Sequence, residues 1–190
     1  MIWRNGIESL NASTITAAFG AQPQGSYLRK LYQIIPSRPT PSKLGALDFV
    51  HDARYGLPVE VISTKLQTNN KPVYKYLIDQ PNPWQSSSRS HHAVDLLFLF
   101  GGVDLSFNPG AETVGAEMRQ RWVAFVNGEV PWSGERRFAY GPLGECREID
   151  EVLFAGRRRV GHMGVLREVG REVYLGIVGA LTAGKISLLN

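Results

Sequence analysis

Paired cysteines, membrane-spanning segments and a secretion signal are all missing from this sequence of 190 residues. Its one cysteine, Cys146, has no partner for an internal disulfide, and a metal cluster held by several cysteines is excluded. No apolar run approaches the roughly 20 residues that a membrane-spanning helix needs. A charge at Arg4 is not followed by an apolar stretch, so no signal peptide is expected. These absences predict a cytoplasmic protein with no membrane span.

Motifs of several common active sites are missing as well. The pattern G-x-S-x-G, which places a serine nucleophile on a sharp turn, does not occur. The phosphate-binding pattern G-x-x-x-x-G-K-[ST] does not occur either, and Gly141 and Gly144 stand too close together for a dinucleotide fingerprint. No cofactor or metal is therefore expected.

The charge balance is only mildly basic, because 21 lysines and arginines face 17 aspartates and glutamates. Such an excess does not identify an anionic partner. The run Arg157-Arg158-Arg159 could contact a phosphate backbone, or it could be the solvated start of a helix. Since no aromatic stacking platform lies near the run, nucleic-acid binding is not expected.

Helical patterns cover most of the chain. Asn11 or Ser13 can cap a short helix that ends at Gly20. Residues 37–45 contain two prolines and a glycine and predict a loop. The other helices are expected over residues 26–35, on both sides of a break at 55–58, over 111–127, and along one stripe of the tail from 166 to 181.

Strand patterns are few. Residues 72–79, PVYKYLID, are rich in strand formers and lie between turn-forming residues, so they predict the best strand. Residues 136–142, RRFAYGP, predict a short edge strand, because Pro142 cannot continue in a central one. A strand needs neighbours to be stable. The sequence therefore predicts a helix-rich α/β chain whose strand either has weakly patterned partners or belongs to a larger sheet.

The densest polar cluster is His91-His92, with Asp95 three residues after His92. Adjacent histidines on a helix diverge by about 100 degrees, so a metal site is not favoured. One histidine could cap or hydrogen-bond the start of the following helix. Alternatively, a histidine on this loop could be a catalytic base, since such bases commonly lie on loops.

Three segments occur in an order that resembles a known enzyme family. They are PVYKYLIDQPNPW, then SHHAVDLLFLFG, then MRQRWVAFVNGEVPW. This order is similar to the C-terminal part of the type-B carboxylesterases, which are cholinesterase-like α/β hydrolases, and the likeness is nearest to fungal members. Counting back from Phe100-Gly101 places His92, not His91, at the catalytic histidine of the family, with Asp95 at its acidic position.

The resemblance implies that residues 1–190 form a single partial type-B carboxylesterase domain, with only the last strands and helices of an α/β-hydrolase fold. The family cleaves carboxylic esters through an acyl-enzyme, using a serine, a glutamate and a histidine. Of these three, only His92 has a counterpart here, because the serine and glutamate motifs of the family lie upstream of the matching region. An ester is the implied substrate, and the isolated chain is expected to be inactive.

Alternatives to an incomplete esterase remain. The chain could be a non-catalytic remnant that binds a protein or a hydrophobic ligand, or, less expected, a basic nucleic-acid binder. Strands missing from the sheet would leave an exposed edge, so self-association is expected. Trp84, Trp122 and Trp132 are expected to pack in the core or in loops and not to form a ligand cage.

Overall fold

The structure is a computed structural model that describes residues 4–91 and 93–183. The chain forms two compact units, and each is described here by itself. Unit 1 comprises residues 1–64 and 159–190, and unit 2 comprises residues 65–158. The prediction of a single domain over residues 1–190 stays a prediction.

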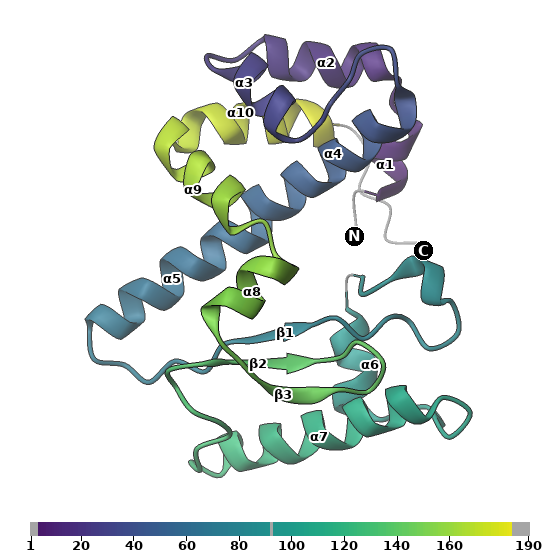
Figure 1. Ribbon diagram of the computed structural model, residues 1–190, viewed down its shortest axis with the longest axis vertical. Coiled ribbons are helices and arrows are strands. Elements are labelled where there is room, and N and C mark those ends of the chain that lie inside the picture. The colour runs from purple at the N-terminus through teal and green to yellow at the C-terminus, as the bar shows by residue number, and fades with distance from the viewer. Residues whose placement is uncertain (1–3, 92, 184–190) are drawn as a thin grey trace. The chain divides into compact units, whose positions relative to one another are not determined.

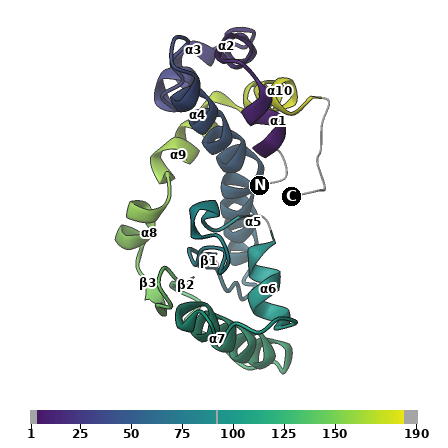
Figure 2. The same cartoon turned by 90° about the vertical axis from the view of Figure 1, so that its right-hand side faces the viewer.

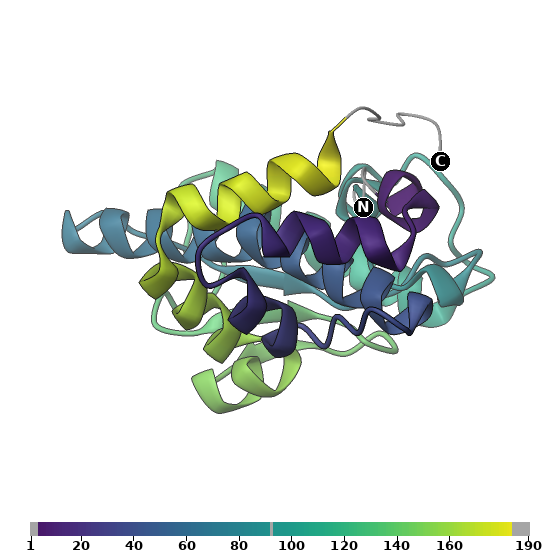
Figure 3. The ribbon, with the colours of Figure 1, turned by 90° about the horizontal axis from the view of Figure 1, so that it is seen from above.

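Unit 1 is entirely helical in its described part. Its elements are α1 (Arg4–Ser9), α2 (Ala12–Gly20), α3 (Gly25–Leu31), α4 (Pro39–His51), the π-helical turn η1 (Asp52–Gly56), most of α5 (Leu57–Thr68), α9 (Val160–Val169) and α10 (Arg171–Thr182). Figure 3 shows α10, in yellow, running alongside α2. The buried core is apolar and includes Ile7, Ile15, Phe19, Leu28, Phe49, Val50, Leu166, Ile177, Val178 and Leu181.

The first helices follow their predicted signals closely. Asn11 caps α2, since its side-chain oxygen accepts a hydrogen bond from the backbone N–H of Thr14 at 2.8 Å, and α2 ends at Gly20. Both features were expected from the sequence. The next helix ends earlier than predicted: α3 stops at Leu31, and Gln33 lies in the left-handed region with φ of 54°. A helix cannot continue through such a residue.

Of two predictions for the middle of unit 1, one is wrong and one is correct in part. Residues 37–45 do not form a loop, because α4 begins at Pro39. Prolines are tolerated in a first helical turn, where the N–H groups have no partner within the helix. The two helices expected on either side of residues 55–58 are present as α4 and α5, but no loop separates them. The π-helical turn η1 carries the chain from one to the other, and the N–H of Leu57 reaches the carbonyl of Asp52.

The tail corrects a third prediction, since the stripe from 166 to 181 belongs to two helices and not to one. Gly170, with φ of 90°, separates α9 from α10. A glycine adopts this left-handed conformation without steric cost. The stripe itself is correct, because Leu166, Ile177 and Leu181 are buried in the core.

Unit 2 is built on a three-stranded mixed sheet. Its strands are β1 (Tyr76–Ile78), β2 (Arg137–Tyr140) and β3 (Cys146–Ile149), in the order β1-β2-β3 (Figure 1). β1 runs parallel to β2, and β2 runs antiparallel to β3. The helices of this unit are α6 (Val94–Phe100), α7 (Pro109–Val126) and α8 (Glu151–Arg157), with a short 3-10 turn, η2 (Ser86–Ser88). The helix expected over 111–127 is confirmed as α7.

The sheet predictions are correct in part. The strand expected over 72–79 is shorter, and it has a partner within the chain. The segment expected to be an edge strand is the central strand β2, because it ends at Tyr140, before Pro142 can interrupt the pairing. β3 carries no strong strand pattern, since Arg147 and Glu148 are poor strand formers, and it was not predicted.

Side chains alternate between the two faces of this sheet. Tyr76, Phe138 and Tyr140 pack with α6 and α7, whereas Leu77 and Ala139 pack with Phe154 of α8. Figure 2 shows α8 on the opposite side of the strands from α6 and α7. The predicted helix-rich α/β fold is thus confirmed. No helix in the described ranges is both long enough and apolar enough to cross a membrane.

Candidate functional site

His92, the predicted catalytic histidine, lies outside the described residues. Its neighbour His91 is described, and its Nε2 lies 2.9 Å from the side-chain nitrogen of Asn82. The oxygen of the same amide accepts hydrogen bonds from the backbone N–H groups of Trp84 and Gln85. The nitrogen of Asn82 therefore faces His91 and donates to it, which places the imidazole proton on Nδ1. His91 thus has a local structural role.

The loop that carries both histidines starts from a fixed point at the end of β1. The backbone N–H groups of Asp79 and Gln80 both donate to the carbonyl of Tyr140, at 2.8 and 3.0 Å. The buried side chain of Gln80 accepts from the backbone N–H of Gly144 at 2.9 Å. Gly141 is required here, since a Cβ at this position would lie 2.3 Å from the nitrogen of Gln80.

Asp95, the acidic member of the predicted cluster, interacts with β1. It lies in the first turn of α6, and its Oδ2 accepts a hydrogen bond from the hydroxyl of Tyr76 at 3.4 Å. Burial raises the pKa of Tyr76 to about 12, with smaller contributions from the charge of Asp95 and from this hydrogen bond. The hydroxyl of Tyr76 is therefore neutral at physiological pH.

The arginine run is not the solvated start of a helix. Arg157 is the last residue of α8, and both Arg157 and Arg158 form ion pairs with Asp79, at 3.3 and 2.8 Å. Arg159, in unit 1, binds Asp52 through two nitrogens, at 2.8 and 2.9 Å. Each guanidinium group thus has an internal carboxylate partner.

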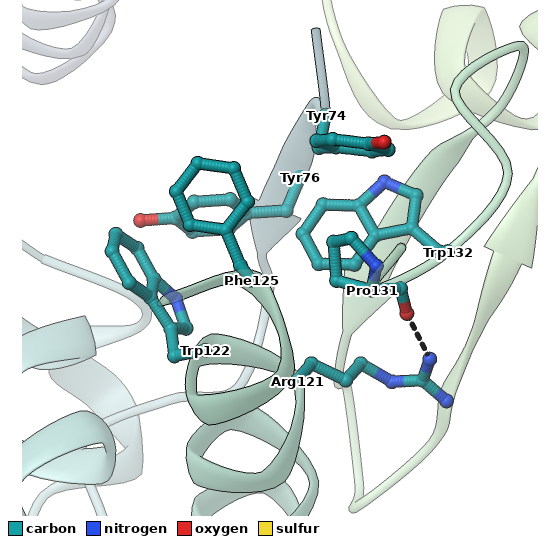
Figure 4. A pocket seen from close by; sticks show the side chains of 7 residues that line it. All are labelled: Tyr74, Tyr76, Arg121, Trp122, Phe125, Pro131 and Trp132. Atoms are coloured by element: carbon teal, nitrogen blue, oxygen red, sulfur yellow. Dashed lines mark hydrogen bonds between the residues drawn. The ribbon is translucent and has the colours of Figure 1, made fainter. Parts of the chain in front are cut away.

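A cavity of about 150 Å³ lies in unit 2, where the aromatic residues of β1, α7 and the segment before β2 meet. We call it the aromatic cavity; its lining residues are Tyr74, Tyr76, Arg121, Trp122, Phe125, Pro131 and Trp132 (Figure 4). The rings meet edge to face: Tyr74 and Trp132 make an angle of 79° at 5.9 Å, and Tyr76 and Trp122 make 79° at 6.3 Å.

The cavity changes the interpretation of the tryptophans. Trp132 is a core residue, only 8% exposed, and Trp122 packs against the same core, as the sequence predicts. Both also line the aromatic cavity. Trp84 is exposed and its ring lies 5.9 Å from that of Phe107, which is a loop contact.

The one charged residue of the lining turns its charge away. Arg121 pairs with Glu117 at 3.1 Å and donates to the carbonyl of Pro131 at 2.6 Å (Figure 4). Its guanidinium carbon also lies 3.9 Å above the ring of Phe138. The stem of Arg121 therefore lines the cavity, while its head is used elsewhere.

Three buried polar atoms near this cavity lack a hydrogen-bond partner among the residues that the structure describes. They are the indole nitrogens of Trp122 and Trp132 and the hydroxyl oxygen of Tyr140. Burial is the main cause that raises the pKa of Tyr140, so its hydroxyl stays neutral. Buried polar groups are usually satisfied, and those left over call for an explanation.

Comparison with known proteins gives one informative likeness. No protein-family profile matches the chain, and no solved structure matches it significantly. The sequence is 25% identical over 181 residues to Lipase 3 of Yarrowia lipolytica, which takes in 87% of this chain and 36% of the relative. The chain thus spans little more than a third of that protein. The likeness supports a lipase- or esterase-like hydrolase in general, and the fold is compatible with part of an α/β hydrolase.

Proposed function

We propose that this chain is the C-terminal part of a type-B serine carboxylesterase, supplying the catalytic base His92 to a nucleophile located upstream. The observation that carries the proposal is the likeness to Lipase 3 over 87% of this chain and only 36% of that relative. Two further features support it, one in the histidine loop and one in the sheet. His91 is already engaged by Asn82, which leaves His92 as the histidine of this loop for chemistry.

The sheet supports the idea of an incomplete enzyme. β1 has a neighbour on one side only within the described part of the chain. In the β1–β2 pair, the carbonyl of Lys75 and the N–H of Asp79 are directed to β2, so the N–H groups of Tyr76 and Ile78 point to the open side. An unpaired strand edge is typical of a surface that another segment covers.

The proposed chemistry is acyl transfer. His92 would take the proton of an upstream serine as that serine attacks the ester carbonyl, and would later activate the water that releases the acid. The chain lacks the G-x-S-x-G motif, and the resemblance to the family places the oxyanion donors, which usually contribute most to catalysis, upstream of the matching region. The isolated chain is therefore expected to hydrolyse esters no faster than buffer.

The test has two arms. The purified chain is assayed with p-nitrophenyl butyrate and with a fluorophosphonate that labels active serines, beside His92→Ala. No turnover and no labelling are expected. Turnover that His92→Ala abolishes would show a nucleophile inside the chain, with residues 86–90 the first place to look, and would refute incompleteness.

In the second arm, the chain replaces the matching region of Lipase 3, and the fusion is compared with its His92→Ala and His91→Ala variants. We expect ester hydrolysis to fall about 10³-fold or more in His92→Ala, as for a missing triad member, and far less in His91→Ala. A soluble, monomeric fusion with equal activity in all three forms would refute the role of His92. A soluble fusion without activity would favour the non-catalytic alternative.

A further inference from the structure

We propose that the aromatic cavity binds a compact, uncharged ligand built on a single aromatic ring, of the chemical class of phenol. The cavity is half open to solvent, and its volume of about 150 Å³ has room for one such ring, since enclosed apolar cavities of about this volume take up benzene. The site lies within unit 2, and every residue that lines it is described. The proposal does not involve His92, so it holds whether or not the chain takes part in ester hydrolysis.

The arrangement of the lining rings favours an aromatic ligand over an aliphatic one. Tyr74 meets Phe125 at 75° and Trp132 at 79°, and Tyr76 meets Trp132 at 82°. In such a cluster each ring directs its positive edge toward the negative face of a neighbour. A further ring placed among them gains the same edge-to-face contacts, which an aliphatic molecule of equal size cannot make (Figure 4).

The charged groups around the site favour a neutral ligand. The guanidinium of Arg121 is taken up by Glu117 and by the carbonyl of Pro131, so it offers little to a carboxylate that enters the cavity. A cation would find no carboxylate among the lining residues, and an unpaired charge is costly to bury.

The experiment titrates the 190-residue protein with phenol, cyclohexanol and benzoate, using calorimetry and tryptophan fluorescence. Phenol is expected to bind saturably, and the other two at least about tenfold more weakly, since one lacks the ring and the other is charged. Absence of saturable phenol binding to protein that circular dichroism shows to be folded would overturn the site. Equal binding of cyclohexanol would overturn the aromatic preference, and equal binding of benzoate would overturn the preference for a neutral ligand.

Two adjacent positions on α7 supply matched variants. Phe125 lines the cavity and is 49% exposed, whereas Val126 is 75% exposed and does not line it. Phe125→Ala is expected to raise the Kd for phenol about tenfold, and Val126→Ala less than about twofold. Phe125→Leu removes the ring while keeping apolar volume, and it should weaken phenol binding without affecting cyclohexanol. Equal effects of the substitutions at 125 and 126 would contradict the assignment.

Discussion

Replacing Asp52 by alanine is expected to lower the free energy of unfolding of unit 1 by about 2–4 kcal/mol. Asp52 is the first residue of the π-helical turn η1 and is only 3% exposed. Its carboxylate accepts hydrogen bonds from two nitrogens of Arg159, at 2.8 and 2.9 Å, and from the hydroxyl of Tyr32, at 3.1 Å. It thereby joins α3, the α4–α5 helix and α9 within one unit.

The magnitude follows from what each partner loses. The hydroxyl of Tyr32 is buried and would be left without a partner, which costs about 1–3 kcal/mol. Removing one member of a fully buried ion pair costs about 3–5 kcal/mol. The side chain of Arg159, however, is 33% exposed and keeps its ion pair with Asp48 at 3.3 Å. The free energy lost through Arg159 therefore lies well below the range for a fully buried pair. The two contributions together remain at about 2–4 kcal/mol.

The measurement is urea unfolding followed by far-ultraviolet circular dichroism, which reports the helices of unit 1. Asp48→Ala is the control, since Asp48 is half exposed and its ion pair should contribute at most about 1 kcal/mol. Combining Asp52→Ala with Tyr32→Phe should recover about 1–2 kcal/mol, because the stranded hydroxyl is removed. The reasoning fails if Asp52→Ala costs no more than Asp48→Ala, or if the Tyr32→Phe change recovers nothing.

Two further predictions concern unit 2. Burial, and then the charge of Glu117, raise the pKa of the Cys146 thiol from 9.0 to about 11. At pH 8 this shift lowers the thiolate fraction about a hundredfold, but the more basic thiolate is about tenfold more nucleophilic. Alkylation by iodoacetamide should therefore be about tenfold slower in folded than in urea-unfolded protein. The raised pKa also predicts that the stability contributed by this thiol is present below pH 9 and lost as the pH rises through 11, and equal alkylation rates in the two states would contradict both statements. The chain is expected to self-associate through the open side of β1. Ile78→Pro removes an N–H on that side, so it should reduce the dimer fraction in sedimentation velocity more than the control Ile78→Ala does. A dimer fraction that neither variant changes, or a monomer in all three forms, would contradict this role of the strand edge.

The sequence predicts the fold best where local chemistry decides it. The cap at Asn11 and the amphipathic pattern of α7 depend on neighbouring residues only, and both are confirmed. The failures occur where long-range contacts decide. β3 has two charged residues in its centre, and only its pairing with β2 makes it a strand. β2 is central because of that same pairing, which no local pattern announces.

The candidate site was predictable to a different degree in its two parts. The histidine loop stands out in the sequence as a polar cluster. The hydrogen bond between Asn82 and His91 could not be predicted, because the two residues are nine positions apart in a loop that has no regular geometry. The aromatic cavity was missed as a site. Its signal was available as Tyr74 and Tyr76 on one face of a strand, and Trp122 and Phe125 three apart on a helix. That pattern is equally typical of a core, and only the position of Trp132 leaves a space between them.

The arginine run shows how a charge pattern can serve the proposed chemistry without touching a substrate. Asp79 directly follows β1 and precedes the loop that leads to His92. Arg157 and Arg158 bind its carboxylate, and its N–H donates to the carbonyl of Tyr140. Further along the same loop, Asn82 binds His91 and, through its N–H, the carbonyl of Arg89. The loop is thus anchored where it leaves β1 and cross-linked between its two limbs. A catalytic histidine needs such support, because a misplacement of about 1 Å costs about a hundredfold in rate. Arg157 and Arg158 are therefore better explained as the anchor of this loop, and Arg159 as the partner of Asp52 in unit 1.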